Sequence, residues 1–107
     1  HARHLYTVLI DTWPAAMAPA STGTPGAARD AVADALSQAG ISTSVHFPPL
    51  HLTRYYADRF GYRRGQFPHA ERLTDTLLSL PLSPAHSDAQ IAAVIRAVRA
   101  IYRDSSR

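Results

Sequence analysis

Two histidines flank a proline pair in the stretch Ser44-Val-His46-Phe47-Pro-Pro-Leu-His51-Leu52. Proline fixes the backbone torsion φ, so this stretch predicts a stiff extended turn that holds both imidazoles on one wall of a cleft. Imidazoles in such a place could donate to a phosphate, a sugar hydroxyl or a carboxylate. The alternative is that His46 is a half-buried strand residue and His51 begins a helix, each satisfied by backbone groups.

Several other chemistries are disfavoured by residue type. The chain has no cysteine and no pair of histidines at helical i, i+4 spacing with an acidic partner, which argues against a metal site. No glycine pattern of a nucleophile elbow surrounds Ser42, Ser44 or Ser79. All eleven cationic side chains are arginines, so no lysine is present to form a Schiff base. Lysine-based covalent catalysis by this chain is therefore excluded.

The length and charge restrict the class of protein. A chain of 107 residues suits one domain with a modest core. The net charge of +3 does not predict nucleic-acid binding, because acidic residues are interspersed and the densest basic cluster is only Arg63-Arg64. No apolar run approaches the roughly 20 residues that span a bilayer. We expect a cytoplasmic protein with neither a nucleic-acid nor a membrane partner.

The first half of the chain predicts a strand, a loop, a helix and a second strand. Residues 4–11 are nearly continuously apolar, as in a strand covered on at least one face. Residues 13–26 combine three prolines and two glycines, which predicts a loop. A helix over 27–39 follows, with Thr24 as N-cap, Pro25 in its first turn and Gly40 as its stop. Its expected buried stripe consists of Ala28, Val32, Ala35, Leu36 and Ala39. Residues 41–47 alternate and predict the second strand.

The second half predicts three helices and a short extended segment. Aromatic residues at helical spacing indicate a helix over 52–60 that stops at Gly61. Pro68 opens the next helix, and residues 79–82 form a strand that Pro81 makes very short or places at an edge. Ser87 and Gln90 form a capping box for the last helix. The expected apolar face of the helix after Pro68 consists of Ala70, Leu73, Leu77 and Leu80, and that of the last helix of Ile91, Val94, Ile95, Val98 and Ile101. The fold class is α/β, a small sandwich of a roughly three-stranded sheet with helices packed on one face.

The order and spacing of several motifs resemble the C-terminal region of the DegT/DnrJ/EryC1/StrS aminotransferases. The resemblance covers essentially the whole chain, and the proline-rich loop over 13–26 is its least familiar part. It rests on Gly40-Ile-Ser-Thr-Ser-Val-His-Phe-Pro-Pro-Leu-His-Leu52, Gly61-Tyr62, Phe67-Pro-His-Ala-Glu-Arg-Leu73 and Leu77-Leu-Ser-Leu-Pro-Leu82.

The resemblance implies that residues 1–107 are the small C-terminal domain of a fold type I enzyme that depends on pyridoxal phosphate (PLP). Such enzymes aminate nucleotide-linked keto sugars in amino-sugar biosynthesis and are typically homodimers. The large domain that carries the PLP lysine lies outside this chain, so we expect no cofactor binding, no catalytic residue and no turnover by the chain alone. His46, Phe47 and His51 are the implied substrate-binding residues, and the large domain and the nucleotide sugar are the implied partners. The alternative is a free-standing, non-catalytic nucleotide-sugar-binding module, or one half of a split aminotransferase.

Overall fold

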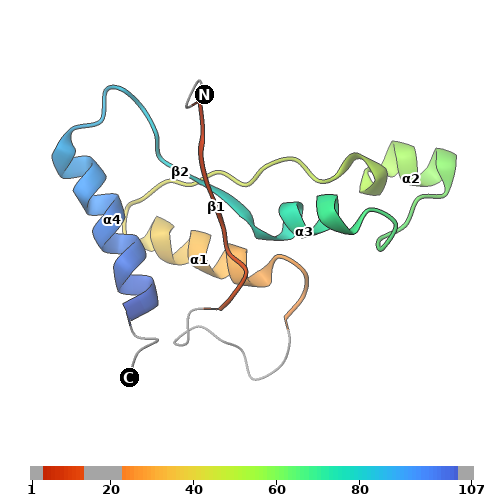
Figure 1. Ribbon diagram of the computed structural model, residues 1–107, viewed down its shortest axis with the longest axis horizontal. Helices are drawn as coiled ribbons and strands as arrows, with labels where there is room; N and C mark the ends of the chain where they lie inside the picture. The colour runs from red at the N-terminus through yellow and green to blue at the C-terminus, as the bar shows by residue number, and fades with distance from the viewer. Residues whose placement is uncertain (1–3, 14–22, 104–107) are drawn as a thin grey trace.

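The computed structural model of the chain describes residues 4–13 and 23–103. Within these ranges it is a small α/β structure with two strands, four α-helices and one 3-10 turn (Figure 1). The strands are β1 (Tyr6–Leu9) and β2 (Leu77–Leu80), and the 3-10 turn is η2 (Leu50–Leu52). The α-helices are α1 (Ala27–Gln38), α2 (Arg54–Phe60), α3 (Pro68–Thr76) and α4 (Asp88–Arg103). Most of the predicted loop over 13–26 lies outside the described residues.

The sheet has two antiparallel strands and one further bridge, rather than three full strands. β1 pairs with β2 in a register that places Val8 opposite Leu78. On the other side of β2, Ser44 and Ser79 exchange both backbone hydrogen bonds, at N···O distances of 3.1 and 2.9 Å. The next such pair in one direction would need an N–H from Pro81, which has none. In the other direction β2 begins directly after α3, so the predicted strand over 41–47 is limited to a single bridge within the described residues.

The core lies on one face of this sheet. Side chains alternate along a strand, so Val8 and Ile10 of the β1 segment share a face with Leu78 and Leu80 of β2. The fully buried members of the core are Val32 and Leu36 of α1 and Leu78 of β2. The C-terminal half of α4 packs against them through side chains that include Val98 and Ile101. This packing confirms the central part of the predicted α1 stripe, whereas Ala39 at its end is exposed.

The helix ends follow the sequence signals only in part. The N-cap of α1 is Gly26, in the left-handed region at φ 84°, and Thr24 instead accepts a bond from the Ala27 N–H through its backbone carbonyl. Gly40, at φ 78°, follows the end of α1 as predicted. The capping box is confirmed, because the Ser87 N–H donates to the Gln90 side chain at 2.9 Å and the Gln90 N–H donates to the Ser87 hydroxyl at 3.2 Å.

Helix α3 corrects two predictions. It ends at Thr76, so the strand after it starts at Leu77, two residues earlier than expected. Its predicted apolar face is not buried, because Ala70 and Leu73 are exposed and Glu71 is the buried residue of the helix. A carboxylate takes the inward position because the N–H groups of Gly65 and Phe67 and the ring of His51 hydrogen-bond to it there.

Residues 45–67, here called the arm, extend away from the core. Figure 1 shows α2 at the opposite end of the longest axis from α4. The predicted short helix is confirmed, although it begins at Arg54, and Gly61 ends it at φ 69°. Neighbouring aromatic rings make contact along the arm, with centroids 4.7 to 5.9 Å apart. The rings in this series are those of Tyr55, Tyr56, Phe60, Tyr62, Phe67 and His51.

Candidate functional site

The histidine and proline segment over 44–52 joins the sheet to the arm. It leaves the sheet at the Ser44–Ser79 bridge, and the half-buried ring of His46 remains over β2, with Nε2 2.5 Å from the Ser79 hydroxyl. Phe47 has 91% of its surface exposed. An exposed phenyl group beside a fixed imidazole provides both an apolar surface and a polar group for a ligand.

His51 lies inside the base of the arm. It has only 7% of its surface exposed, and its Nε2 is 2.8 Å from Oε1 of Glu71. Its ring also contacts that of Phe67, with centroids 4.7 Å apart. His51 is therefore satisfied by a carboxylate, and not by the backbone groups that the alternative sequence interpretation supposed.

Glu71 is the centre of a polar cluster that sequence reasoning missed. Both of its carboxylate oxygens accept from the Gly65 N–H at 2.8 Å, and Oε1 also accepts from the Phe67 N–H at 3.3 Å. Burial opposes ionisation, but the hydrogen bonds from Gly65, His51 and Phe67 outweigh it and hold the pKa of Glu71 below its ordinary value. The one sequence signal was an acidic residue in the helical turn after Pro68.

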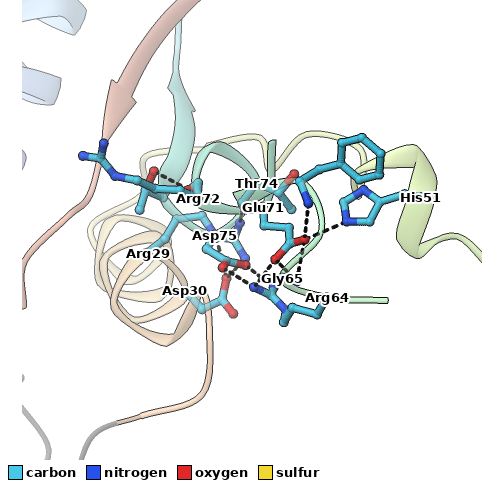
Figure 2. Close-up of polar contacts among 11 residues, drawn as sticks. Arg29, Asp30, His51, Arg64, Gly65, Glu71, Arg72, Thr74 and Asp75 are labelled. Carbon is cyan, nitrogen blue, oxygen red and sulfur yellow. Dashed lines mark hydrogen bonds and ion pairs between the residues drawn. The ribbon is translucent and has the colours of Figure 1, made fainter. Parts of the chain in front are cut away.

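Arg64 extends this cluster along α3 (Figure 2). Its guanidinium donates to both oxygens of Asp75 at 2.9 and 2.8 Å and lies 3.7 Å from Glu71. The hydrogen bond with Asp75 is the main reason that the pKa of Arg64 is raised. At the far end of α3, the buried Arg29 of α1 pairs with Asp30 and donates to the carbonyl of Thr74. Two separate groups of polar contacts thus fix α3, one to the arm through His51 and Arg64 and the other to α1 through Arg29.

The segment does not place its two histidines against one common cavity. An open apolar groove of about 460 Å³ on the arm is lined by His51 but not by His46. Its other lining residues are Pro49, Leu50, Tyr56, Phe60, Tyr62, Phe67 and Ala70. A second hollow of about 330 Å³ lies beside the bridge and is lined by Ser44 and Ser79. None of His46, Phe47 and His51 lines it. The three predicted residues therefore occupy different surroundings: His46 lies over the sheet, Phe47 is in solvent and His51 is buried.

Two further observations concern residues 4–13 and 23–103. No group of three or more histidine, aspartate or glutamate side chains there is placed to hold a metal ion. No helix within the same ranges has both the length and the apolar character needed to cross a membrane.

Comparison with known proteins identifies the family. The sequence profile of the DegT/DnrJ/EryC1/StrS aminotransferase family matches residues 6–99, and this chain belongs to that family. The chain is 39% identical over 104 residues to the spore coat polysaccharide biosynthesis protein SpsC of Bacillus subtilis, covering 96% of this chain and 24% of the relative. It is 35% identical over 105 residues to an uncharacterized protein of Methanocaldococcus jannaschii, covering 98% of this chain and 25% of the relative. The chain thus spans about a quarter of the length of these relatives.

Proposed function

We propose that this chain is the C-terminal small domain of a PLP-dependent aminotransferase that acts on a nucleotide-linked keto sugar. The main support for this proposal is that nearly the whole chain matches about a quarter of the length of its relatives. A match of this kind is expected for one domain of a larger enzyme. The relative SpsC is a spore coat polysaccharide biosynthesis protein, which supports a role of this chain in making an amino sugar. We further propose that the complete enzyme is a cytoplasmic homodimer.

The residues of this chain do not fit the covalent attachment of PLP. Attachment requires a lysine amine, and the chain has eleven arginines but no lysine. On this proposal the attachment site belongs to the large domain. The contribution of this chain is to receive the sugar nucleotide and to hold the receiving segment in place.

The proposed receiving residues are His46, Phe47 and His51, in two different roles. His46 and Phe47 contact the substrate, because Phe47 is 91% exposed and the Ser79 hydroxyl orients the His46 ring. His51 does not contact the substrate but fixes the turn in place through its buried hydrogen bond with Glu71. Because Pro48-Pro49 stiffens the turn between them, little conformational entropy is lost on binding.

Substitutions in the complete enzyme test this assignment. We expect His46→Ala and Phe47→Ala each to raise the KM for the sugar nucleotide by about tenfold, the value of one lost contact of about 1.4 kcal/mol. His51→Ala should raise it through displacement of the turn. The visible absorption of the bound cofactor should be unchanged in all three. Tyr55→Ala, an exposed aromatic of the arm outside the segment, is the matched control. An unchanged KM in all three variants would contradict the assignment.

One measurement distinguishes our proposal from the alternatives of a free-standing sugar-nucleotide-binding module or one half of a split enzyme. Mass spectrometry of the natural polypeptide gives its length, and our proposal expects a polypeptide several times longer than this chain. Transamination by the purified 107-residue chain would contradict our proposal and the alternatives alike, because the chain has no lysine.

A further inference from the structure

The N-terminal half of α4 carries an apolar face that has no partner among the described residues. The predicted stripe of this helix continues from Val98 and Ile101, which pack in the core, to Ile95 and Ile91. These two isoleucines are 45% and 48% exposed, although they lie on the same side of the helix as the buried half. The stripe is therefore longer than the surface that residues 4–13 and 23–103 pack against it.

An apolar groove lies between this part of α4 and the sheet. It has a volume of about 450 Å³, and Tyr6 and Val8 of β1 form one wall. Leu80 and Leu82 continue that wall along β2 and beyond it, and Ile91 and Ile95 form the opposite wall. The groove continues the core of the domain, since Val8, Leu80 and Val98 belong to both. Figure 1 shows α4 set apart from the two strands, with α1 lying nearer the lower part of the helix.

We propose that this groove is the docking surface for the large domain of the same polypeptide. The inference rests on the proposed function, and the occupant is chosen because this chain accounts for only about a quarter of the length of its relatives. An exposed seam of aliphatic side chains that is continuous with a core is typical of a contact between two domains.

The charge at the rim of the groove restricts the chemistry of the docking face. Arg99 lines the groove one turn after Ile95, and it makes no ion pair within residues 4–13 and 23–103. The docking face should therefore carry aliphatic side chains for Ile91 and Ile95, together with a carboxylate at the position of Arg99. An isolated small apolar ligand would leave this cation unmatched.

Thiol labelling in the complete enzyme tests the inference. Since this chain has no cysteine, a cysteine introduced at 95 can be followed through its own peptide. We expect maleimide to label Ile95→Cys at least about tenfold more slowly than Arg96→Cys, the exposed neighbour on the same helix, because a covered thiol reacts only when the contact opens. Ile91→Cys serves as the second covered position. In urea all three should react at the same rate, which controls for intrinsic reactivity.

Each outcome decides between occupants. Protection that persists on dilution supports the large domain of the same polypeptide, whereas protection lost on dilution would indicate a second copy and overturn the proposal. Equal labelling of Ile95→Cys and Arg96→Cys would also overturn it. Transaminase activity of the Arg96→Cys enzyme is measured in parallel, so that failure of the proposed function is seen separately from failure of the docking surface.

Discussion

The core and the arm of this domain are stabilised by different kinds of contact. Val32, Leu36 and Leu78 are at most 2% exposed and form an aliphatic core between α1 and the sheet. In the arm, residues 45–67, the buried residue is His51, and its partner is a carboxylate. Burial of apolar surface is strong but not directional, whereas hydrogen bonds are directional and weaker. The core therefore supplies stability, and the polar cluster sets the orientation of the candidate site.

The largest expected effect comes from the core. Leu36→Ala removes a side chain with no exposed surface and should cost about 2–5 kcal/mol, because a cavity remains where the side chain packed. Hydrogen exchange of α1, followed by mass spectrometry, should show the loss. Ser37→Ala, at the exposed next position, should leave the exchange unchanged. If Leu36→Ala accelerated exchange in the arm more than in α1, the conclusion that the core and the arm are stabilised by different contacts would be wrong.

A smaller and more local effect is expected at Glu71. Glu71→Ala leaves His51 and the N–H groups of Gly65 and Phe67 without their acceptor, so exchange of the arm should accelerate by roughly tenfold while α1 is little changed. Glu71→Gln keeps one acceptor oxygen and should show a smaller acceleration. Equal acceleration in both regions would mean that the cluster supports the whole domain.

Lowering the pH should destabilise the arm more than α1. Because the pKa of Glu71 is lowered in the folded protein, its carboxylate stabilises the arm fully above the unfolded value of about 4.3. This contribution is lost as the pH falls through the lowered pKa. Exchange of the arm, corrected for intrinsic rates, should therefore accelerate relative to α1 below about pH 4. The Glu71→Gln variant should lack this difference, and its persistence in that variant would assign the effect to another group.

The smallest effect is expected on the surface of α2. Arg54 and Asp58 form an i, i+4 pair at 3.7 Å, with side chains 96% and 74% exposed. Such pairs contribute about 0.3–0.5 kcal/mol at low salt. Arg54→Ala should thus change the exchange of α2 by no more than about twofold, and 0.5 M salt should remove even that difference. A larger change would show that α2 depends on charge for its position.

Several features that depend on neighbours in sequence were predictable, although the N-cap predicted at Thr24 was wrong, and features that depend on distant partners were not. The capping box of α4 and the stops at Gly40 and Gly61 were read correctly from local spacing. The strand over 41–47 was expected from its alternating residues, yet its pairing depends on what lies opposite, and Pro81 cannot supply the next hydrogen bond.

The candidate site shows the same limit. The segment that carries His46, Phe47 and His51 was found from its spacing, but the burial of His51 was not, because its partner lies 20 residues away. The burial of Glu71 and Arg29 was also missed, because charged residues are ordinarily expected at the surface. No local pattern marks a carboxylate that accepts from a loop and a histidine together.

The pairing of β1 with β2 has a consequence for the order of folding. β1 is the first element of the described chain, and its partner strand follows the whole of α1, the arm and α3. Contacts between such distant segments form slowly, and β1 lacks its partner strand until the ribosome has made residues 77–80. The Ser44 bridge and the Ser79 contact to His46 depend on that same strand. The histidine segment can therefore reach its native position only late in folding, after the chain beyond it has been synthesised.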